Sequence, residues 1–184
     1  MATNGIRLIT PTSVDVTGAG SSATINAGGS VTFSTAATLS LNGVFSATYD
    51  NYIIEMQLRS NGSNADVYGR LRLSGSDASG SNYTVQVLNS NSTSVTGVRL
   101  TSQTSMIICT VDNVTERAGS TTYVYGPGLA QPTAFRSVNV RTASGAFISD
   151  DASTHSLSTA YDGITLTPSG GTLTGLVKVY GLVQ

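Results

Sequence analysis

The sequence predicts an all-β protein, an antiparallel β-sandwich or jelly roll, and three observations predict it. Apolar and polar residues alternate at a period of two over most of the chain, which is typical of strands with one buried face. Short runs of Gly, Asn, Asp and Ser separate these segments, as turns between strands do. No window of twelve residues sustains a 3.6-residue period free of Gly and β-branched residues, so we expect no long helix.

The chain begins with a segment of different character. Residues 1–21 mix apolar residues with Pro11 and lead into a flexible Gly- and Ser-containing run, so we expect an N-terminal arm. This arm lies along its own domain or reaches a neighbouring subunit, and the sequence leaves both open. Residues 22–184 are expected to form a single β-sandwich domain, because a chain of 184 residues supports one core of ordinary size.

Strands are expected at regular intervals after the arm. The clearest is residues 52–58, where Tyr52 and Ile54 share one face and Glu55 lies on the other. Longer candidates of the same kind are residues 67–73, 83–87, 134–140 and 173–180, and shorter ones are residues 23–25, 31–34, 38–41, 121–125, 146–149, 155–158 and 164–167. About a dozen strands joined by turns therefore indicate a sandwich rather than a parallel sheet, with a helical turn at most near residues 112–117.

Two of the longer segments also predict which side chains face the core. Leu73 should face inward and Arg72 outward, because they occupy adjacent positions of an alternating strand. Val138 and Val140 share one face of a later strand, which Arg136 interrupts.

Composition limits the classes of function. Charged residues make up 10% of the chain against about 25% in an average soluble protein, while Ser, Thr, Gly and Asn are abundant. An uncharged polar surface suits contact with other proteins, because little charge has to be desolvated. The net charge of −1 and the single lysine, Lys178, provide no basic stripe for phosphates, so nucleic acid is not an expected partner.

Targeting features point the same way. The first residues lack the charged and apolar regions of a secretory signal, and no stretch approaches eighteen apolar residues. We therefore expect no membrane association and synthesis in a cytoplasm.

The grouping that comes nearest to a catalytic arrangement is centred on the single histidine, His155. Asp150, Asp151 and Ser156 lie close to it in sequence, but a triad is defined by geometry, and no Gly-x-Ser-x-Gly turn marks an activated serine. We interpret this segment as a polar turn that leads into a strand. Cys109 lies in an apolar run without a cysteine partner, which is typical of a buried thiol.

Paired carboxylates and metal ligands are equally sparse. The two glutamates, Glu55 and Glu116, fall on an outward strand face and in a polar loop, which does not suit glycosidase chemistry. One Cys and one His cannot complete a zinc site. Asp77 and Asn82 flank a polar loop in which a calcium ion is an open alternative, although a hydrogen-bonded turn is favoured. We predict no catalytic residue, no cofactor and no metal ligand, and hence a protein that is not an enzyme.

Three segments, residues 31–52, 70–83 and 171–181, resemble a family of tailed-bacteriophage virion proteins that are described as structural. Such proteins occur among phages of cyanobacteria and other marine bacteria, and the resemblance extends over residues 13–183. It implies a β-sandwich in the particle, either as a capsid decoration (cement) protein or as part of a fibre. It implies no active site.

The resemblance and the composition together lead to one expected function and one alternative. We expect a capsid decoration protein in the virion that bridges capsomers, with itself as a homotrimer and the major capsid protein as partners. The alternative is a tail or head fibre, or a receptor-binding module, that contacts other fibre or tail proteins and recognises host surface glycans. In that case the loops at residues 74–82 and 89–96 are the candidate contact sites.

Overall fold

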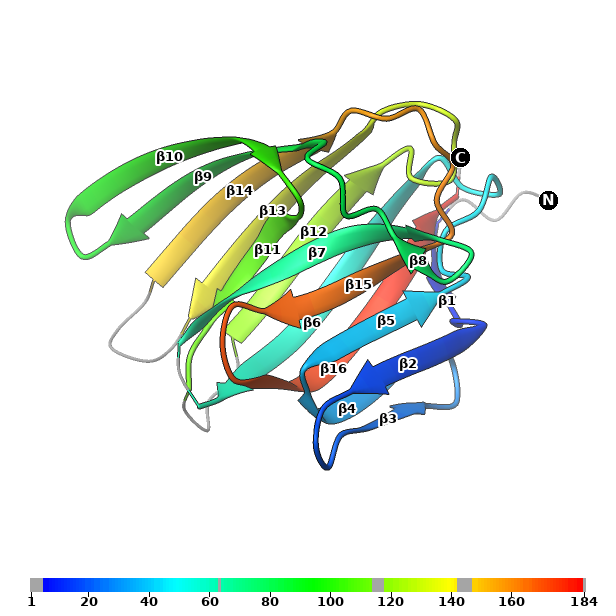
Figure 1. The fold of residues 1–184 in the computed structure, drawn as a ribbon, viewed down its shortest axis with the longest axis horizontal. Helices are drawn as coiled ribbons and strands as arrows, with labels where there is room; N and C mark the ends of the chain where they lie inside the picture. The colour runs from blue at the N-terminus through cyan, green and yellow to red at the C-terminus, as the bar shows by residue number, and fades with distance from the viewer. Residues whose placement is uncertain (1–4, 63, 114–117, 142–146, 184) are drawn as a thin grey trace.

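Two antiparallel sheets face each other in the computed structural model of the chain, which describes residues 5–62, 64–113, 118–141 and 147–183 (Figure 1). Every regular element among these residues is a β-strand. The predicted all-β sandwich is therefore confirmed.

The larger sheet has ten strands. In order across the sheet they are β10 (Ser94–Gln103), β9 (Tyr83–Asn91), β14 (Phe147–His155), β13 (Thr133–Arg141), β12 (Ala118–Tyr125), β6 (Asn51–Asn61), β16 (Thr172–Leu182), β4 (Val31–Ala36) and β3 (Ser22–Ile25), while β1 (Ile6–Ile9) also pairs with β16. All of these pairings are antiparallel.

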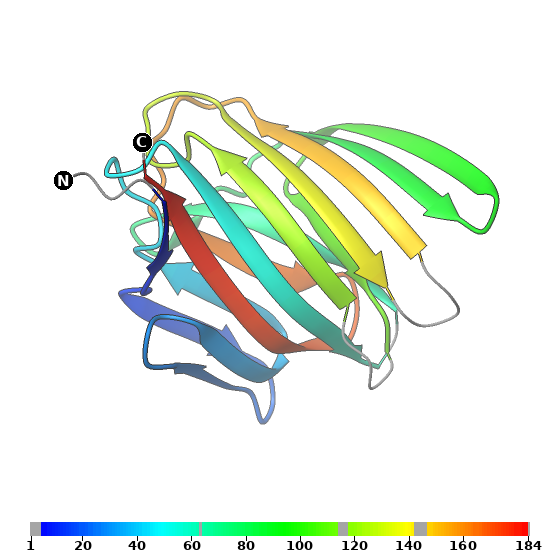
Figure 2. The ribbon, with the colours of Figure 1, turned by 180° about the vertical axis from the view of Figure 1, so that it is seen from behind.

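The smaller sheet has six strands. Their order is β11 (Met106–Val111), β7 (Ala65–Leu73), β15 (Gly163–Pro168), β5 (Thr38–Asn42) and β2 (Ser13–Thr17), and the short β8 (Ser76–Asp77) pairs with β7. We call the side of the larger sheet that faces this smaller sheet its inner face, and the opposite side its outer face. Figure 2, seen from behind, shows that no described strand covers the outer face.

The apolar core lies between the two sheets, where the period-two pattern predicts it. Tyr52 and Ile54 of β6 are fully buried, as expected, and Leu166 of β15 closes the core from the smaller sheet. Gly175 of β16 is required here, because a Cβ at that position would collide with the carbonyl oxygen of Gln57 on the neighbouring strand.

The N-terminal segment is part of this sandwich. Residues 6–9 form β1 on β16, and residues 13–17 form β2 on β5. Of the two placements that the sequence left open, the described part of the segment therefore lies along its own domain.

Three strands differ from the sequence-based expectation. β10 was not predicted, because both of its faces are exposed and its residues do not alternate in polarity. The segment that forms β11 was described as an apolar run around Cys109 and was not predicted to be a strand. β14 is one continuous strand over the segment that we interpreted as a polar turn followed by a strand, and this interpretation is wrong. Its inner face carries polar side chains, so no apolar alternation marked it as a strand.

The prediction that Leu73 is buried and Arg72 is exposed is also wrong. Leu73 is 43% exposed and Arg72 only 8%. The guanidinium of Arg72 donates to the Asp77 carboxylate at 2.6 Å, to the hydroxyls of Ser40 and Thr165, and to the carbonyl of Gly75. The chain that returns through β8 covers Arg72, so a buried cation is stabilised by a full set of acceptors.

Candidate functional site

Strands β12, β13 and β14 have an apolar side that points away from the core. Val138 and Val140 of β13 are 46% and 45% exposed, and Ile148 of β14 is 50% exposed, all on the outer face. Val140 and Ile148 are direct cross-strand partners, so the three side chains form one continuous aliphatic surface. The sequence places Val138 and Val140 on the same face of their strand, and in the structure this face points to solvent.

The inner face of the same three strands is buried, and most of its side chains are polar, beside the apolar Ala118, Val124 and Phe135. The Thr122 and Ser137 hydroxyls are 2.8 Å apart, and Ser149 donates to Asn139 at 2.8 Å. The full set of buried polar residues here is Ser120, Thr122, Thr133, Ser137, Asn139, Ser149, Asp151, Ser153 and His155. The usual arrangement of a sandwich, apolar inside and polar outside, is therefore reversed in this part of the sheet.

This reversal has a physical implication. Because side chains alternate with a period of two, turning each strand over would bury the valines and expose the hydroxyls. The chain instead retains an exposed aliphatic face over a polar interior that is only partly hydrogen-bonded, since buried side-chain atoms of Ser120, Thr133, Asp151, Ser153 and His155 have no partner among the described residues. Nine of the thirteen large apolar side chains that are exposed in the described chain lie on this outer face: Ile6, Leu8, Leu88, Val95, Tyr123, Tyr125, Val138, Val140 and Ile148. Contiguous apolar surface of this kind marks a contact site.

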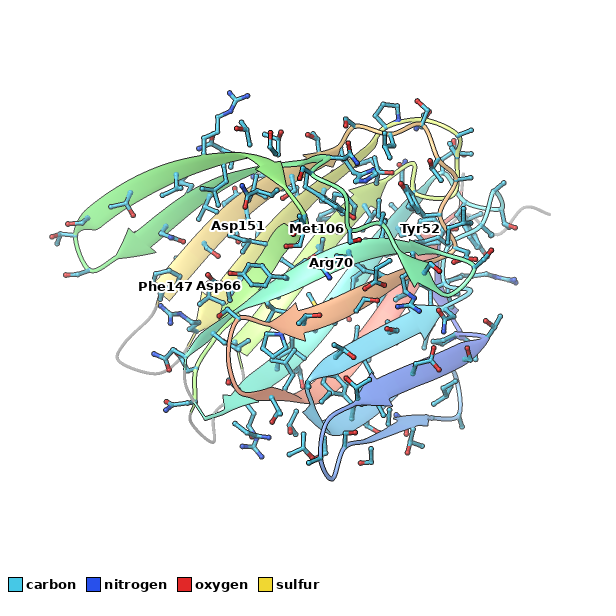
Figure 3. All side chains as sticks on the ribbon, in the orientation of Figure 1. Tyr52, Asp66, Arg70, Met106, Phe147 and Asp151 are labelled. Carbon is cyan, nitrogen blue, oxygen red and sulfur yellow. The ribbon has the colours of Figure 1, made fainter. Side chains whose placement is uncertain are left out.

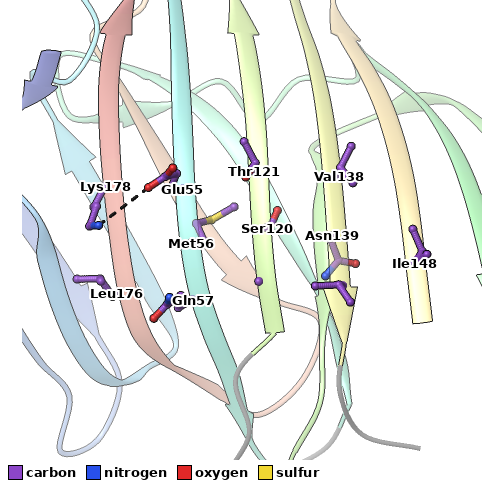
Figure 4. A pocket seen from close by; sticks show the side chains of 12 residues that line it. Glu55, Met56, Gln57, Ser120, Thr121, Val138, Asn139, Ile148, Leu176 and Lys178 are labelled. Carbon is purple, nitrogen blue, oxygen red and sulfur yellow. Dashed lines mark ion pairs between the residues drawn. The ribbon is translucent and has the colours of Figure 1, made fainter. Parts of the chain in front are cut away.

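The outer face is also hollowed. A depression of about 610 Å³ runs over β12, because Gly119 and Thr121 place little bulk between their neighbours (Figure 4). Val138 and Val140 form one side of it, and the Lys178 side chain of β16 lies on the other. The depression therefore has one aliphatic wall and one polar wall.

Charges on the outer face are paired with one another. Arg136 and Asp150 form a bidentate ion pair with donor–acceptor distances of 3.1 and 2.7 Å. The hydrogen bond from Arg136 lowers the pKa of Asp150 below its usual value. Lys178 lies 4.0 Å from Glu55, which also accepts a hydrogen bond from the Tyr180 hydroxyl. These pairs leave out Arg59 of β6 and Arg99 of β10, which lie on the same face, so the face as a whole carries a small positive charge.

The histidine-centred grouping does not assemble. Asp150 points to the outer face, whereas Asp151 and His155 lie on the inner face of β14, four residues and about 13 Å apart. Among the described residues, the His155 ring has one hydrogen-bond contact, with the Tyr161 hydroxyl at 3.4 Å, and burial lowers the pKa of its imidazole. Ser156 is exposed beyond the strand. The structure offers no nucleophile and base in contact at this place.

Asp151 is the most perturbed acid of the inner face (Figure 3). It is 2% exposed, and burial raises its pKa from 3.8 to about 7, while one hydrogen bond from Ser149 acts in the opposite direction. The thiol of Cys109 is buried nearby, and its pKa is raised by burial and by the Asp151 charge. A thiol with a raised pKa is a poor nucleophile.

The remaining candidates are placed as follows. Asp77 is held by Arg72 and accepts from the Thr165 hydroxyl at 2.7 Å, so a guanidinium occupies the position in which a calcium ion was an alternative. The backbone N–H of Asn82 donates to the Gly80 carbonyl. Glu116 lies outside the described residues. Within the described ranges, no three His, Cys, Asp or Glu side chains are grouped as a metal site.

The two loops proposed for glycan recognition differ in character. Residues 74–82 contain β8 and cover Arg72, so part of that loop has a structural task. Residues 89–96 form the tip of the β9–β10 hairpin, which extends past the smaller sheet (Figure 1).

Comparison with known proteins adds little to this site. The crystal structure of galectin LEC-6 from Caenorhabditis elegans is similar, with 10% identity, a TM-score of 0.37, and coverage of 77% of this chain and 89% of that chain. At that TM-score the likeness carries no functional argument. No protein-family model matches the chain, and no curated protein matches it significantly. In the part of the chain that the structure describes, no helix has the length and apolar character needed to cross a membrane.

Proposed function

We propose that the chain is a non-enzymatic structural protein of a tailed-bacteriophage virion, a capsid decoration protein that seats the outer face of its larger sheet on shell protein. The observation that carries the proposal is the partial reversal of β12–β14, which places Val138, Val140 and Ile148 in solvent above an interior rich in buried polar side chains. The resemblance over residues 13–183 suggests that the chain belongs to a phage particle. The exposed aliphatic face is the surface through which we expect it to attach.

The chemistry of this face favours a protein partner. An aliphatic surface gains free energy when apolar side chains of a partner cover it, at about 25 cal/mol per Å². The charges nearest to the aliphatic surface and the depression, Arg136 with Asp150 and Lys178 with Glu55, are already paired, so they need no partner of opposite charge. Sugar hydroxyls need hydrogen-bonding groups, which Glu55, Gln57 and Lys178 offer on the polar wall of the depression, but the aliphatic wall and the surface beyond it offer none.

Location and copy number in the virion test the role. Gold-labelled antibodies should mark the shell, and quantitative mass spectrometry should count hundreds of copies per particle. A label confined to the tail, with a few to a few dozen copies, would instead establish the fibre or receptor-binding alternative.

Charge placed in the aliphatic surface should abolish attachment. Val138→Asp combined with Ile148→Asp is expected to reduce co-sedimentation with virion shells stripped of the protein at least 100-fold, because two carboxylates would be desolvated at the contact. Leu73→Asp is the matched control, since Leu73 is similarly exposed but lies on the smaller sheet. Equal loss in the control, or no loss in the double variant, would refute the assigned face.

Filling the depression tests the same face without adding charge. A Cβ at Gly119 would meet the Val140 Cγ1 at 3.8 Å, an ordinary contact, so Gly119→Leu should fold with unchanged thermal stability. Its side chain would occupy the space over β12, and we expect shell binding to weaken at least 10-fold. Gly119→Ala is the control and should bind nearly as the parent does. Undiminished binding of the leucine variant would show that nothing enters the depression.

A further inference from the structure

The strand β10 leaves one long edge of the larger sheet without a described partner. β10 spans ten residues, Ser94–Gln103, and pairs only with β9. The β9–β10 hairpin extends beyond the smaller sheet (Figures 1 and 2), so neither of its faces is covered there. Val95 on the outer side is 65% exposed and Val98 on the inner side is 48% exposed. Backbone groups and apolar side chains are therefore both available along this edge.

This edge lacks the features that usually keep edge strands apart. Residues 94–103 contain no Lys, Pro, Asp or Glu, and Arg99 is their single charged residue. The irregular pairing between Leu100 and Gln103 affects only the end of the strand. A bare edge of this length adds strands readily, because each added strand completes backbone hydrogen bonds.

We propose that β10 pairs antiparallel with β10 of a second copy of the chain, which joins two larger sheets across a twofold axis. The other outermost strands are short, four residues in β1 and β3, five in β2 and six in β11. Another β10 is therefore the described edge that matches this one in length, and the antiparallel arrangement closes with two copies. A threefold ring, as expected from composition, would have to form through faces rather than through this edge.

The side chains of β10 accept such a pairing. When the twofold axis passes through Gly97, Val95 of one copy faces Arg99 of the other, and no two charges are opposed. The two Arg99 guanidinium groups then lie about four residues, or about 14 Å, apart along the strands, beyond the range of strong repulsion at physiological salt. Val98 of each copy gains a neighbour on the inner side.

The pairing would also enlarge the attachment face. Leu88 and Val95 lie on the outer side at this end of the sheet, Val95 paired to Ser90 and Ser90 paired to Ile148. Two sheets joined at β10 therefore place two aliphatic surfaces side by side. The proposal does not depend on shell binding, because it concerns the edge and not the outer face.

Light scattering on the purified full chain tests the proposal. We expect a mass of twice the 18.8 kDa chain at micromolar concentration. Val95→Lys combined with Val98→Lys should weaken dimerisation at least 10-fold, while Leu73→Lys with Leu157→Lys, at positions of 43% and 44% exposure, should leave it unchanged. The Val138→Asp, Ile148→Asp variant should remain dimeric, so failure of this inference and failure of shell attachment are distinguishable.

Hydrogen exchange provides a readout that does not require a variant. Among residues 95–99, the alternate amides whose N–H groups point away from β9 should exchange more slowly as protein concentration rises through the dimer range. A monomer at 500 μM, a trimer, or a dimer that survives both lysines with unprotected β10 amides would overturn the proposal.

Discussion

Replacing Asp151 with Asn is expected to stabilise the protein by about 4 kcal/mol at pH 8 and to remove most of its loss of stability between pH 4 and pH 7. The carboxyl is 2% exposed, and burial raises its pKa to about 7 from a value of 3.8. A rise of this size corresponds to about 4 kcal/mol between the two protonation states.

The sign follows from proton counting. Between pH 4 and pH 7 the folded chain holds the Asp151 proton while the unfolded chain has released it, so unfolding becomes easier as the pH rises. Below pH 4 both states are protonated and the penalty is absent. Above pH 7 the folded state contains a buried carboxylate, and the full penalty applies. An amide at this position carries no charge at any pH, so the penalty disappears.

Urea unfolding at a series of pH values measures the effect. Asp150→Asn is the control on the adjacent residue, which points to the outer face and has a lowered pKa because of Arg136. The pKa shift of Asp150 is opposite in sign to that of Asp151. The Asp150→Asn variant should therefore lose a little stability at neutral pH and none at pH 2. Parallel pH profiles for the parent and the Asp151 variant would show that this carboxyl is not desolvated.

Arg72→Met is expected to destabilise the protein by about 3 kcal/mol. Removing the guanidinium leaves the Asp77 carboxylate, 25% exposed, without its ion partner, and it takes one donor from each of the Ser40 and Thr165 hydroxyls, which keep their hydrogen bond to each other. Loss of one partner from a buried ion pair has a cost of this order. Denaturant unfolding of the two proteins gives the difference directly.

The control for that prediction is the other arginine–aspartate pair. Arg136→Met removes an ion pair of similar length whose side chains are 61% and 35% exposed to solvent, so the loss of stability should be much smaller than at Arg72. Arg72→Met combined with Asp77→Asn should recover part of the loss, since no unpaired carboxylate remains. Equal losses at the two arginines would contradict the burial of Arg72.

Sequence periodicity predicted where the strands lie better than it predicted which face of each strand is buried. In β6, Tyr52 and Ile54 are apolar and buried, so pattern and burial agree. In β13 the alternation is just as regular, but Val138 points outward and Ser137 inward. Period two reveals that a strand has two faces, and only the packing of the second sheet determines which face it covers.

The candidate site could not be predicted for the same reason. Asn139, Ser149 and Asp151 form one hydrogen-bonded set that two separate segments of the chain contribute. A sequence signal does exist: these segments carry Ser, Thr, Asn and Asp at alternate positions. Such a signal gains meaning only once β13 and β14 are known to be neighbours.

A cryo-EM map of the virion tests the central claim most directly. We predict that side chains of shell protein lie within about 4 Å of Val138, Val140 and Ile148, with the depression over Gly119 filled. A map in which this face is turned to solvent, and the chain is attached through its smaller sheet or its loops, would contradict the account.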